Sequence, residues 1–167
     1  MQEILTQRLI LKPLQKSDDE NLFFLCSDSE VMKYIRKPDT DIFQAKKKIK
    51  SLLDYTSQNP SFGLWMAYAK DTKEHLGFVL LLHIENNPEY PIEVGYRLHT
   101  KFWNQGYATE MSKALIKYGK DLGLKSVSGI TIEENINSIH VLEKSGLKYI
   151  EDRLYYELPV RYYEVEL

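Results

Sequence analysis

The sequence predicts an α/β protein in which about seven strands and about four helices form a single domain over residues 1–167. Two observations support this fold class. Hydrophobic residues recur at helical spacing in some segments and alternate in others, in the order β-α-α-β-β-β-α-β-α-β-β. The chain is also long enough for one sizeable core, and no internal repeat, low-complexity tract or linker divides it.

The N-terminal segments contain one strand followed by helices. Leu9 and Leu11 alternate with Arg8, Ile10 and Lys12, which predicts a strand over residues 6–13 that ends at Pro13. Ser17-Asp18-Asp19-Glu20 predicts a capping box and a helix start. A second short helical piece is expected over residues 28–35.

A longer amphipathic helix is predicted over residues 41–55. Its apolar residues share one face: Ile42, Ala45, Ile49, Leu52 and Leu53. The opposite face would leave a run of lysines mostly in solvent: Lys46, Lys47, Lys48 and Lys50.

The middle of the chain changes to a strand pattern. Strands are predicted over residues 62–69, 76–84 and 92–98, and residues 71–73 form a hairpin turn between the first two. The strand over 76–84 is rich in Val, Leu and Phe, which favours a central position. Gly95 in the middle of the third strand indicates a bulge or a close backbone approach.

The C-terminal part alternates helices and strands. A helix is predicted over residues 108–122, a strand over 126–132, and a second helix capped by Asn135 or Asn137 that ends near Gly146. Two final strands, over residues 147–157 and 161–166, would be joined by a break at Pro159. These strands are a possible dimer edge, so the chain would be a monomer or a homodimer.

Composition limits the function classes. The net charge of −2 gives no general reason to bind nucleic acid. Cys26 is the single cysteine and stands in an apolar stretch, so it is expected to be a buried thiol in a reducing compartment. No signal peptide and no apolar run of membrane-spanning length is visible, so a cytoplasmic protein without a membrane partner is expected.

The most informative stretch is Trp103-Asn104-Gln105-Gly106-Tyr107-Ala108-Thr109-Glu110, between a predicted strand and a predicted helix. The first N–H groups of a helix have no internal acceptor and carry partial positive charge. Small residues such as Gly106 and Ala108 let a ligand approach them, so the stretch is typical of a diphosphate cradle. It lacks the Gly-Lys-Ser/Thr of a P-loop and the glycines of a dinucleotide fold. An ordinary helix start remains the alternative.

Three groups of residues together resemble the GCN5-related N-acetyltransferase (GNAT) family, and within it the ribosomal-protein N-acetyltransferase (RimJ/RimL-like) branch. The first is Thr6-x-Arg8-Leu9-x-Leu11-x-Pro13. The second is Glu93-Val94-Gly95-Tyr96-x-Leu98 followed by the stretch from Trp103 to Glu110. The third is Asn135-x-Asn137-Ser138 with Glu143-Lys144-x-Gly146-Leu147. The match runs nearly end to end and keeps the order and spacing of the motifs.

The resemblance implies a mostly antiparallel, twisted sheet whose fourth and fifth strands splay apart to admit acetyl-CoA. No metal is implied. The residues expected to bind the cofactor lie on the fourth strand, in the loop and on the last helix: Tyr96, Arg97, Leu98, Trp103, Asn104, Gln105, Gly106, Tyr107, Ala108, Thr109, Asn135, Asn137, Ser138, His140 and Lys144. Several have a plainer alternative: Asn135 and Asn137 as helix caps, Trp103 and Tyr107 as core aromatics, and Lys144 as a complement to the helix C-terminus.

Acetyl transfer needs a base for the amine and an acid for the departing thiolate. Glu93 is the expected base, directly or through a water, with a solvated strand glutamate as the alternative and His99 and His140 as runners-up. Many relatives have a tyrosine acid in the last helix, where this sequence has Leu142. Ser138 is therefore the expected acid by resemblance, or else a capping serine.

The implied function is acetyl-CoA-dependent N-acetylation of a primary amine by direct attack in a ternary complex. The acceptor is open between a peptide or protein N-terminus and a small amine. Glu85, Glu89 and Glu93 would suit a cationic acceptor, or are ordinary surface glutamates. Because of Leu142, a catalytically weak acetyl-CoA-binding sensor or interaction module of the same fold is the alternative.

Overall fold

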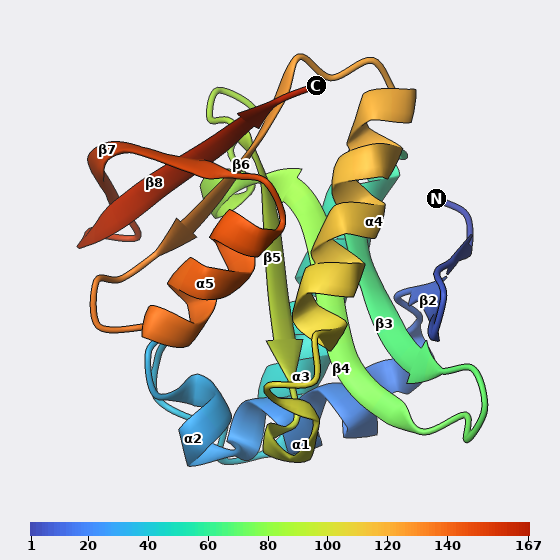
Figure 1. The fold of residues 1–167 in the computed structure, drawn as a ribbon. Helices are drawn as coiled ribbons and strands as arrows, with labels where there is room; N and C mark the ends of the chain where they lie inside the picture. Colours follow the sequence, from blue (N-terminus) through green and yellow to red (C-terminus); the bar gives the residue numbers. More distant parts are fainter.

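The computed structural model describes residues Met1–Leu167 and contains one eight-stranded sheet, in the order β1-β2-β3-β4-β5-β6-β8-β7 (Figure 1). The strands are β1 (Ile4–Leu5), β2 (Leu9–Pro13), β3 (Gly63–Ala69), β4 (His75–His83), β5 (Ile92–Leu98), β6 (Ser126–Thr131), β7 (Lys148–Tyr155) and β8 (Leu158–Glu166). All neighbours are antiparallel except β5 and β6, which are parallel. The predicted mixed, mostly antiparallel sheet is confirmed, and the additional strand is the two-residue β1.

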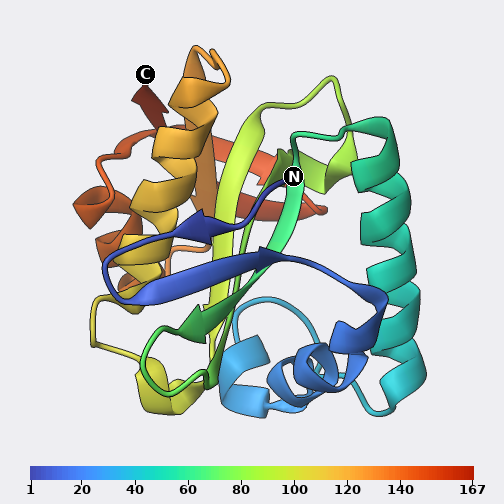
Figure 2. The ribbon, with the colours of Figure 1, turned by 90° about the vertical axis from the view of Figure 1, so that its right-hand side faces the viewer.

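Helices cover both faces of this sheet. They are α1 (Asp19–Ser27), α2 (Ser29–Met32), α3 (Ile42–Gln58), α4 (Tyr107–Asp121) and α5 (Ile136–Lys144). Figure 2 shows α3 on one side of the sheet and α4 on the other. Because side chains alternate along a strand, β4 contributes to both cores. Val79 and Leu81 pack in the core that contains residues of α4 and α5, and Phe78 and Leu82 pack in the core that contains residues of α1 and α3.

The N-terminal helices differ from expectation in their ends. The predicted piece over residues 28–35 is the four-residue α2, whose cap Asp28 accepts hydrogen bonds from the amides of Glu30 and Val31. The expected capping box before α1 lies earlier, because the amide of Gln15 donates to Asp18 Oδ2 (2.8 Å) and α1 begins at Asp19. Asp41 caps α3 by accepting from the amides of Phe43 and Gln44.

Two predicted irregularities in the strands are wrong. β5 pairs with β4 residue by residue from Gly77↔Leu98 to His83↔Ile92, so Gly95 forms no bulge. Instead Leu80 packs on it: a Cβ at Gly95 would lie 3.0 Å from Leu80 Cδ1. The break between the last strands falls at Tyr156 and Glu157, which have φ of 53° and 59°, and Pro159 lies inside β8 opposite Leu154.

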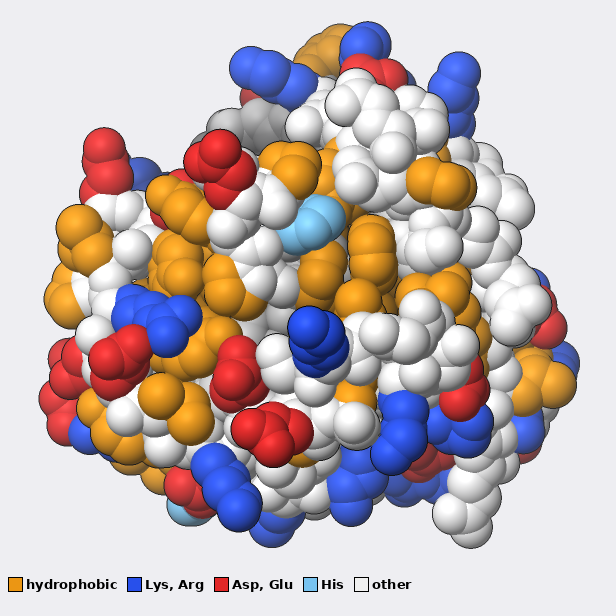
Figure 3. All heavy atoms as spheres, turned by 90° about the horizontal axis from the view of Figure 1, so that it is seen from above, with side chains coloured by type: hydrophobic (Ala, Val, Ile, Leu, Met, Phe, Trp, Pro, Cys, Tyr) orange, Lys and Arg blue, Asp and Glu red, His pale blue; other side chains and the backbone are white.

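The surface carries mixed charge. Seen from above Figure 1, hydrophobic side chains gather in the middle of the face, and Lys and Arg stand among Asp and Glu around them (Figure 3). This face therefore presents no continuous basic surface. None of the helices has the length and apolar character needed to cross a lipid bilayer.

Candidate functional site

The sheet opens between β5 and β6, as the predicted splay requires. The two strands share a single register pair, Glu93↔Ser128, and the Ser128 hydroxyl donates to the carbonyl of Ile92 (2.8 Å). Every other neighbouring pair in the sheet has at least two register pairs. Beyond Glu93, β5 therefore presents an edge to β6 whose backbone groups are free to bind a ligand.

Backbone alternation decides which residues of β5 use this edge. The carbonyls of Ile92 and Leu98 accept from the Ser128 hydroxyl and the Trp103 indole, neither of which lies on β4. The amide of His99, one residue later, donates to Leu76 at the β4 side. The backbone groups of Tyr96 and Leu98 therefore face the opening. Those of Arg97 face β4, so the structure does not bring Arg97 to the expected cofactor edge.

The stretch after β5 forms the expected turn at the mouth of α4. Gly106 precedes the helix with φ of 79°, a left-handed conformation that favours glycine. Asn104 is also left-handed, with φ of 59°. The backbone N–H groups of residues 104–109 donate no hydrogen bond to any other group of the protein. A run of unsatisfied donors at a helix N-terminus fits a bound diphosphate.

Arg8 and Glu110 connect the turn before α4 to the start of β2. Glu110 accepts hydrogen bonds from the Thr6 hydroxyl (2.6 Å), the Arg8 amide (2.8 Å) and Arg8 Nε (2.7 Å). Arg8 Nη1 also donates to the carbonyl of Gln105 (3.0 Å). Burial acts to raise the pKa of Glu110, but the hydrogen bonds and the charge of Arg8 outweigh it and hold this pKa below its usual range. The sequence motif contained both residues, yet neither was expected at the site.

The two aromatic residues of the loop support it from within the protein. The Trp103 indole donates to the Leu98 carbonyl (2.8 Å). The Tyr107 ring packs against Phe102, and the Arg8 guanidinium carbon lies 4.1 Å from its centroid. Their side chains thus fix the loop, so a contact of these two residues with a ligand would come from the backbone.

Helix α5 places the remaining predicted residues beside the opening. Asn135 caps the helix by accepting from the Ser138 amide (3.1 Å). The Tyr96 hydroxyl donates to the Ser138 carbonyl (3.1 Å) and lies 3.0 Å from Ser138 Oγ, so it links β5 to α5. Leu142 is buried against Gly129 of β6, where no proton donor is available. The other predicted residues of α5 are exposed: Asn137, His140 and Lys144.

Glu93 lies at the point where β5 and β6 part. Its side chain points to the face of α1 and α3, opposite to Tyr96, and the residue is only 8% exposed. Burial raises the pKa of Glu93 to about 7, and a hydrogen bond from Tyr156 offsets part of the rise. A solvated strand glutamate is excluded. A carboxylate that is half ionised near neutral pH is suited to accept a proton from an amine.

Tyr156 is a site residue that the sequence did not indicate. It occupies the left-handed turn between β7 and β8, and its hydroxyl accepts from the amide of Glu85 (3.0 Å). The Glu85 carboxylate in turn accepts from the Tyr156 amide. Partial burial and the neighbouring Glu93 carboxylate raise the pKa of Tyr156 to about 12. Glu85 is thus engaged with this turn, which leaves it little freedom to attract a cationic acceptor.

The two histidine alternatives lie away from Glu93. His99 follows the opposite end of β5, about 20 Å along the strand, and its Nε2 lies 3.4 Å from Nδ1 of His75. His140 is exposed on α5. No group of three or more His, Cys, Asp and Glu side chains is arranged to hold a metal ion.

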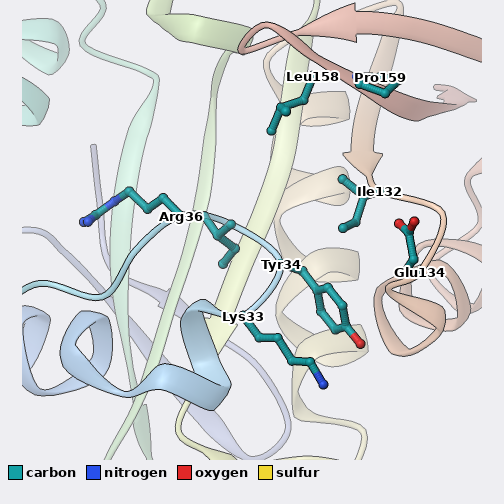
Figure 4. Close-up of a pocket in the computed structure, with 8 residues that line it drawn as sticks. Lys33, Tyr34, Arg36, Ile132, Glu134, Leu158 and Pro159 are labelled. Atoms are coloured by element: carbon teal, nitrogen blue, oxygen red, sulfur yellow. The ribbon is translucent and has the colours of Figure 1, made fainter.

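A cleft of about 330 Å³ lies beside the opening (Figure 4). Figure 4 shows that the segment after α2 forms one wall and that the end of β6 and the start of β8 form the other. Its lining residues are Lys33, Tyr34, Ile35, Arg36, Ile132, Glu134, Leu158 and Pro159. Half of these residues are hydrophobic, and the cleft is open to solvent.

Comparisons with known proteins agree with this geometry. Residues 8–148 match the family model described as an acetyltransferase (GNAT) domain. FsC-acetyl coenzyme A-N(2)-transacetylase of Aspergillus fumigatus is 33% identical over 155 residues, which cover 87% of this chain and 65% of that protein. The chain thus spans just under two thirds of that relative's length. The uncharacterized N-acetyltransferase p20 of Bacillus licheniformis is 30% identical over 154 residues, which cover 88% of this chain and 85% of that protein.

Solved structures show the same fold. RimL, a ribosomal L7/L12 alpha-N-protein acetyltransferase solved in complex with coenzyme A, has a TM-score of 0.83 at 16% identity, covering 99% of this chain and 98% of that one. A GNAT-family acetyltransferase from Bacillus anthracis has a TM-score of 0.82 at 22% identity, covering 98% of each chain. The resemblance to the ribosomal-protein branch therefore extends to the fold. The chain belongs to the GNAT family of acetyltransferases and is an N-acetyltransferase.

Proposed function

We propose that this protein transfers an acetyl group from acetyl-CoA to a primary amine by direct attack of the amine in a ternary complex. The observation that carries the proposal is Glu93, a buried carboxylate with a pKa of about 7 at the point where β5 and β6 separate. Free backbone donors for a diphosphate lie on the same strand–loop–helix unit. The protein would work in the cytoplasm, as a monomer or a homodimer.

The residues present fit acetyl-CoA. The amides of residues 104–109 would hold the diphosphate, and the backbone groups of Tyr96 and Leu98 would pair with the amide-containing pantetheine arm. Asn137, His140 and Lys144 lie exposed on α5, where they can contact the outer part of the cofactor. Acetyl-CoA supplies the thioester whose acetyl group is transferred.

Glu93 supplies the base. An ammonium has no lone pair, so the acceptor must lose a proton before it can attack, and Glu93 takes this proton directly or through a water. The new bond joins the amine nitrogen to the acetyl carbon, and the bond that breaks joins that carbon to sulfur. Tyr156 sets the basicity of Glu93, because its hydrogen bond favours the ionised carboxylate.

Ser138 supplies the proton for the departing thiolate. Its hydroxyl lies 3.0 Å from the Tyr96 hydroxyl, which also donates to the Ser138 carbonyl. Burial raises the pKa of Tyr96, so this phenol stays protonated and holds Ser138 in place. The pair thus replaces the tyrosine that Leu142 does not provide.

The test measures thiol release with a panel of amines and peptides against pH. The kcat/KM of the wild type should rise with pH through about 7, because Glu93 must be ionised. In Glu93→Gln the rise of kcat/KM with pH through about 7 should disappear, and kcat should fall by about 100-fold or more. The Kd for CoA should stay near the wild-type value. Ser138→Ala should keep the rise and lose about 10- to 100-fold in kcat. An unchanged rise in Glu93→Gln would refute the assignment.

A catalytically weak acetyl-CoA-binding module is the second candidate, and the buried Leu142 favours it. The same assay separates the two. Tight acetyl-CoA binding without thiol release on any amine supports the module. Steady turnover that depends on Glu93 supports the enzyme.

A further inference from the structure

Three basic side chains from different elements gather on the face of β5 that carries Glu93. Arg97 of β5 lies with its Nη1 3.4 Å from Cys26 Sγ. The Arg97 guanidinium carbon and Lys48 Nζ of α3 lie 5.3 Å and 5.9 Å from the centroid of the same Phe78 ring. Arg36, in the segment after α2, is the third member and contributes to the wall of the cleft in Figure 4.

This cluster has an excess of positive charge. Its one carboxylate, Asp39, lies 2.5 Å from Arg36 Nη1 and is tied to Cys26 through its backbone amide (2.8 Å). Neither Lys48 nor Arg97 forms an ion pair with a carboxylate of the protein. Two cations therefore remain unneutralised where solvent is partly excluded.

Burial makes this arrangement costly for the protein alone. Burial and, to a smaller extent, the charge of the neighbouring Arg97 lower the pKa of Lys48 to about 8. Burial also lowers the pKa of Arg97, which nevertheless remains charged. A charge taken out of water is expensive unless it is paired. An anion bound between Lys48 and Arg97 would remove this cost.

The cluster lies within reach of an acceptor held at Glu93. Glu93 and Arg97 point to the same face of β5, about 13 Å apart along the strand, with Gly95 between them. Leu80 packs over Gly95 and provides an apolar floor between the two charged ends. An acceptor lying along this floor would place its ammonium at the carboxylate and an anionic group at the cations.

We propose that the acceptor amine carries an anionic group, a carboxylate or a phosphate, which binds between Lys48 and Arg97. The inference rests on the proposed acetyl transfer and names the class of its acceptor. Arg36 adds positive charge at the outer side and links the anion site to the cleft. Such an acceptor has charges of both signs, so it satisfies Glu93 and the basic cluster together.

The test compares acceptors that share an amine and differ in one charge. Suitable pairs are peptides with Glu or Gln, and peptides with phosphoserine or serine, at the second or third residue, because a free amino acid is too short to reach from Glu93 to the basic cluster. The wild type should prefer the anionic member by about 10- to 100-fold in kcat/KM. The Glu and Gln pair identifies a carboxylate site, and the phosphoserine and serine pair identifies a phosphate site.

The variants separate this inference from the proposed function. Lys48→Met should abolish the preference while kcat/KM on neutral acceptors and the Kd for CoA stay at wild type, and Lys48→Arg should restore part of it. Lys47→Met, on the exposed side of α3, is the matched control and should change nothing. Turnover without any charge preference would overturn the inference and leave acetyl transfer standing.

A binding measurement covers the case without turnover. Calorimetry with inorganic phosphate and with acetate should show binding to the wild type that Lys48→Met loses. Loss of turnover on every amine together with retained, Lys48-dependent anion binding would refute acetyl transfer and keep the anion site. No anion binding to the wild type and no charge preference would refute the site.

Discussion

Glu93 shows how a single residue can be kept at a cost to stability. Its carboxyl group is buried, and its pKa rises from 4.5 to about 7 on folding. Between these values the folded protein binds a proton that the unfolded chain has lost. The stability contribution of the protonated group is therefore complete below about pH 4.5 and is lost as pH rises through about 7.

Glu93→Gln should accordingly stabilise the protein at alkaline pH and leave it unchanged in acid. A shift of this size corresponds to about 3 kcal/mol at most. Denaturant unfolding at pH 8 should show the variant more stable by about 1–3 kcal/mol, and at pH 4.5 the two proteins should coincide. Equal stability at both pH values would contradict the raised pKa.

Local conformation could be predicted where near neighbours decide it. Gly106 takes the left-handed turn before α4, and Asn135 caps α5 by accepting from the Ser138 amide. Tyr156 could not be predicted, because its turn uses left-handed Tyr and Glu instead of Asn-Gly, and its partner Glu85 is 71 residues away. Lys48 was expected in solvent and instead lies half-buried over Phe78.

At the scale of elements, the turn before α4 combines strain and function. Gly106 is left-handed, and the open space at the cradle leaves its would-be Cβ only Arg8 at 3.5 Å. Gly123, after α4, is also left-handed, with φ of 82° and nothing within 4 Å of a Cβ. Both glycines thus need a left-handed backbone conformation, and they lie at opposite ends of the same helix.

Gly106→Ala and Gly123→Ala should therefore lose a similar amount of stability, about 1 kcal/mol, because alanine is disfavoured in the left-handed region. Only Gly106→Ala should weaken CoA binding, since its methyl group enters the cradle. Thermal unfolding and CoA titration of both variants check this. Equal CoA affinity in the two would place the diphosphate elsewhere.

The elements themselves were well predicted where periodicity is strong. The helices α3 and α4 and the strands β3 to β6 lie within a few residues of expectation. Errors occurred where long-range packing decides. A bulge or a close backbone approach was predicted at Gly95, whereas the structure has regular pairing there and the Leu80 side chain packed on the glycine. Arg97 was assigned to the cofactor edge by the family resemblance, but backbone alternation turns its N–H and C=O groups to β4.

For the whole molecule, the decisive feature is the single register pair between β5 and β6. The order of the strands on either side places α4 and α5 on one face and α1 to α3 on the other. The opening that results needs the complete sheet, so the sequence could indicate it only through the family resemblance.

Amide hydrogen exchange should report this opening directly. In the free protein the amides of Tyr96 and Leu98, which face the opening, should exchange quickly. Those of Gly95 and Arg97, paired with β4, should exchange slowly and serve as internal controls. CoA should slow the first pair and leave the second almost unchanged. Uniform protection across β5 without CoA would mean that the strands do not part.

The alternation of β5 also bears on how such proteins diverge. In the proposed mechanism, one side of the strand, with Tyr96, serves the acetyl donor, and the other, with Glu93 and Arg97, serves the acceptor. Substitutions in α3 or in the turn at Tyr156 can alter which amine is accepted while the binding of acetyl-CoA stays unchanged. Lineages that share this strand can thus acquire new acceptors by changing one surface at a time.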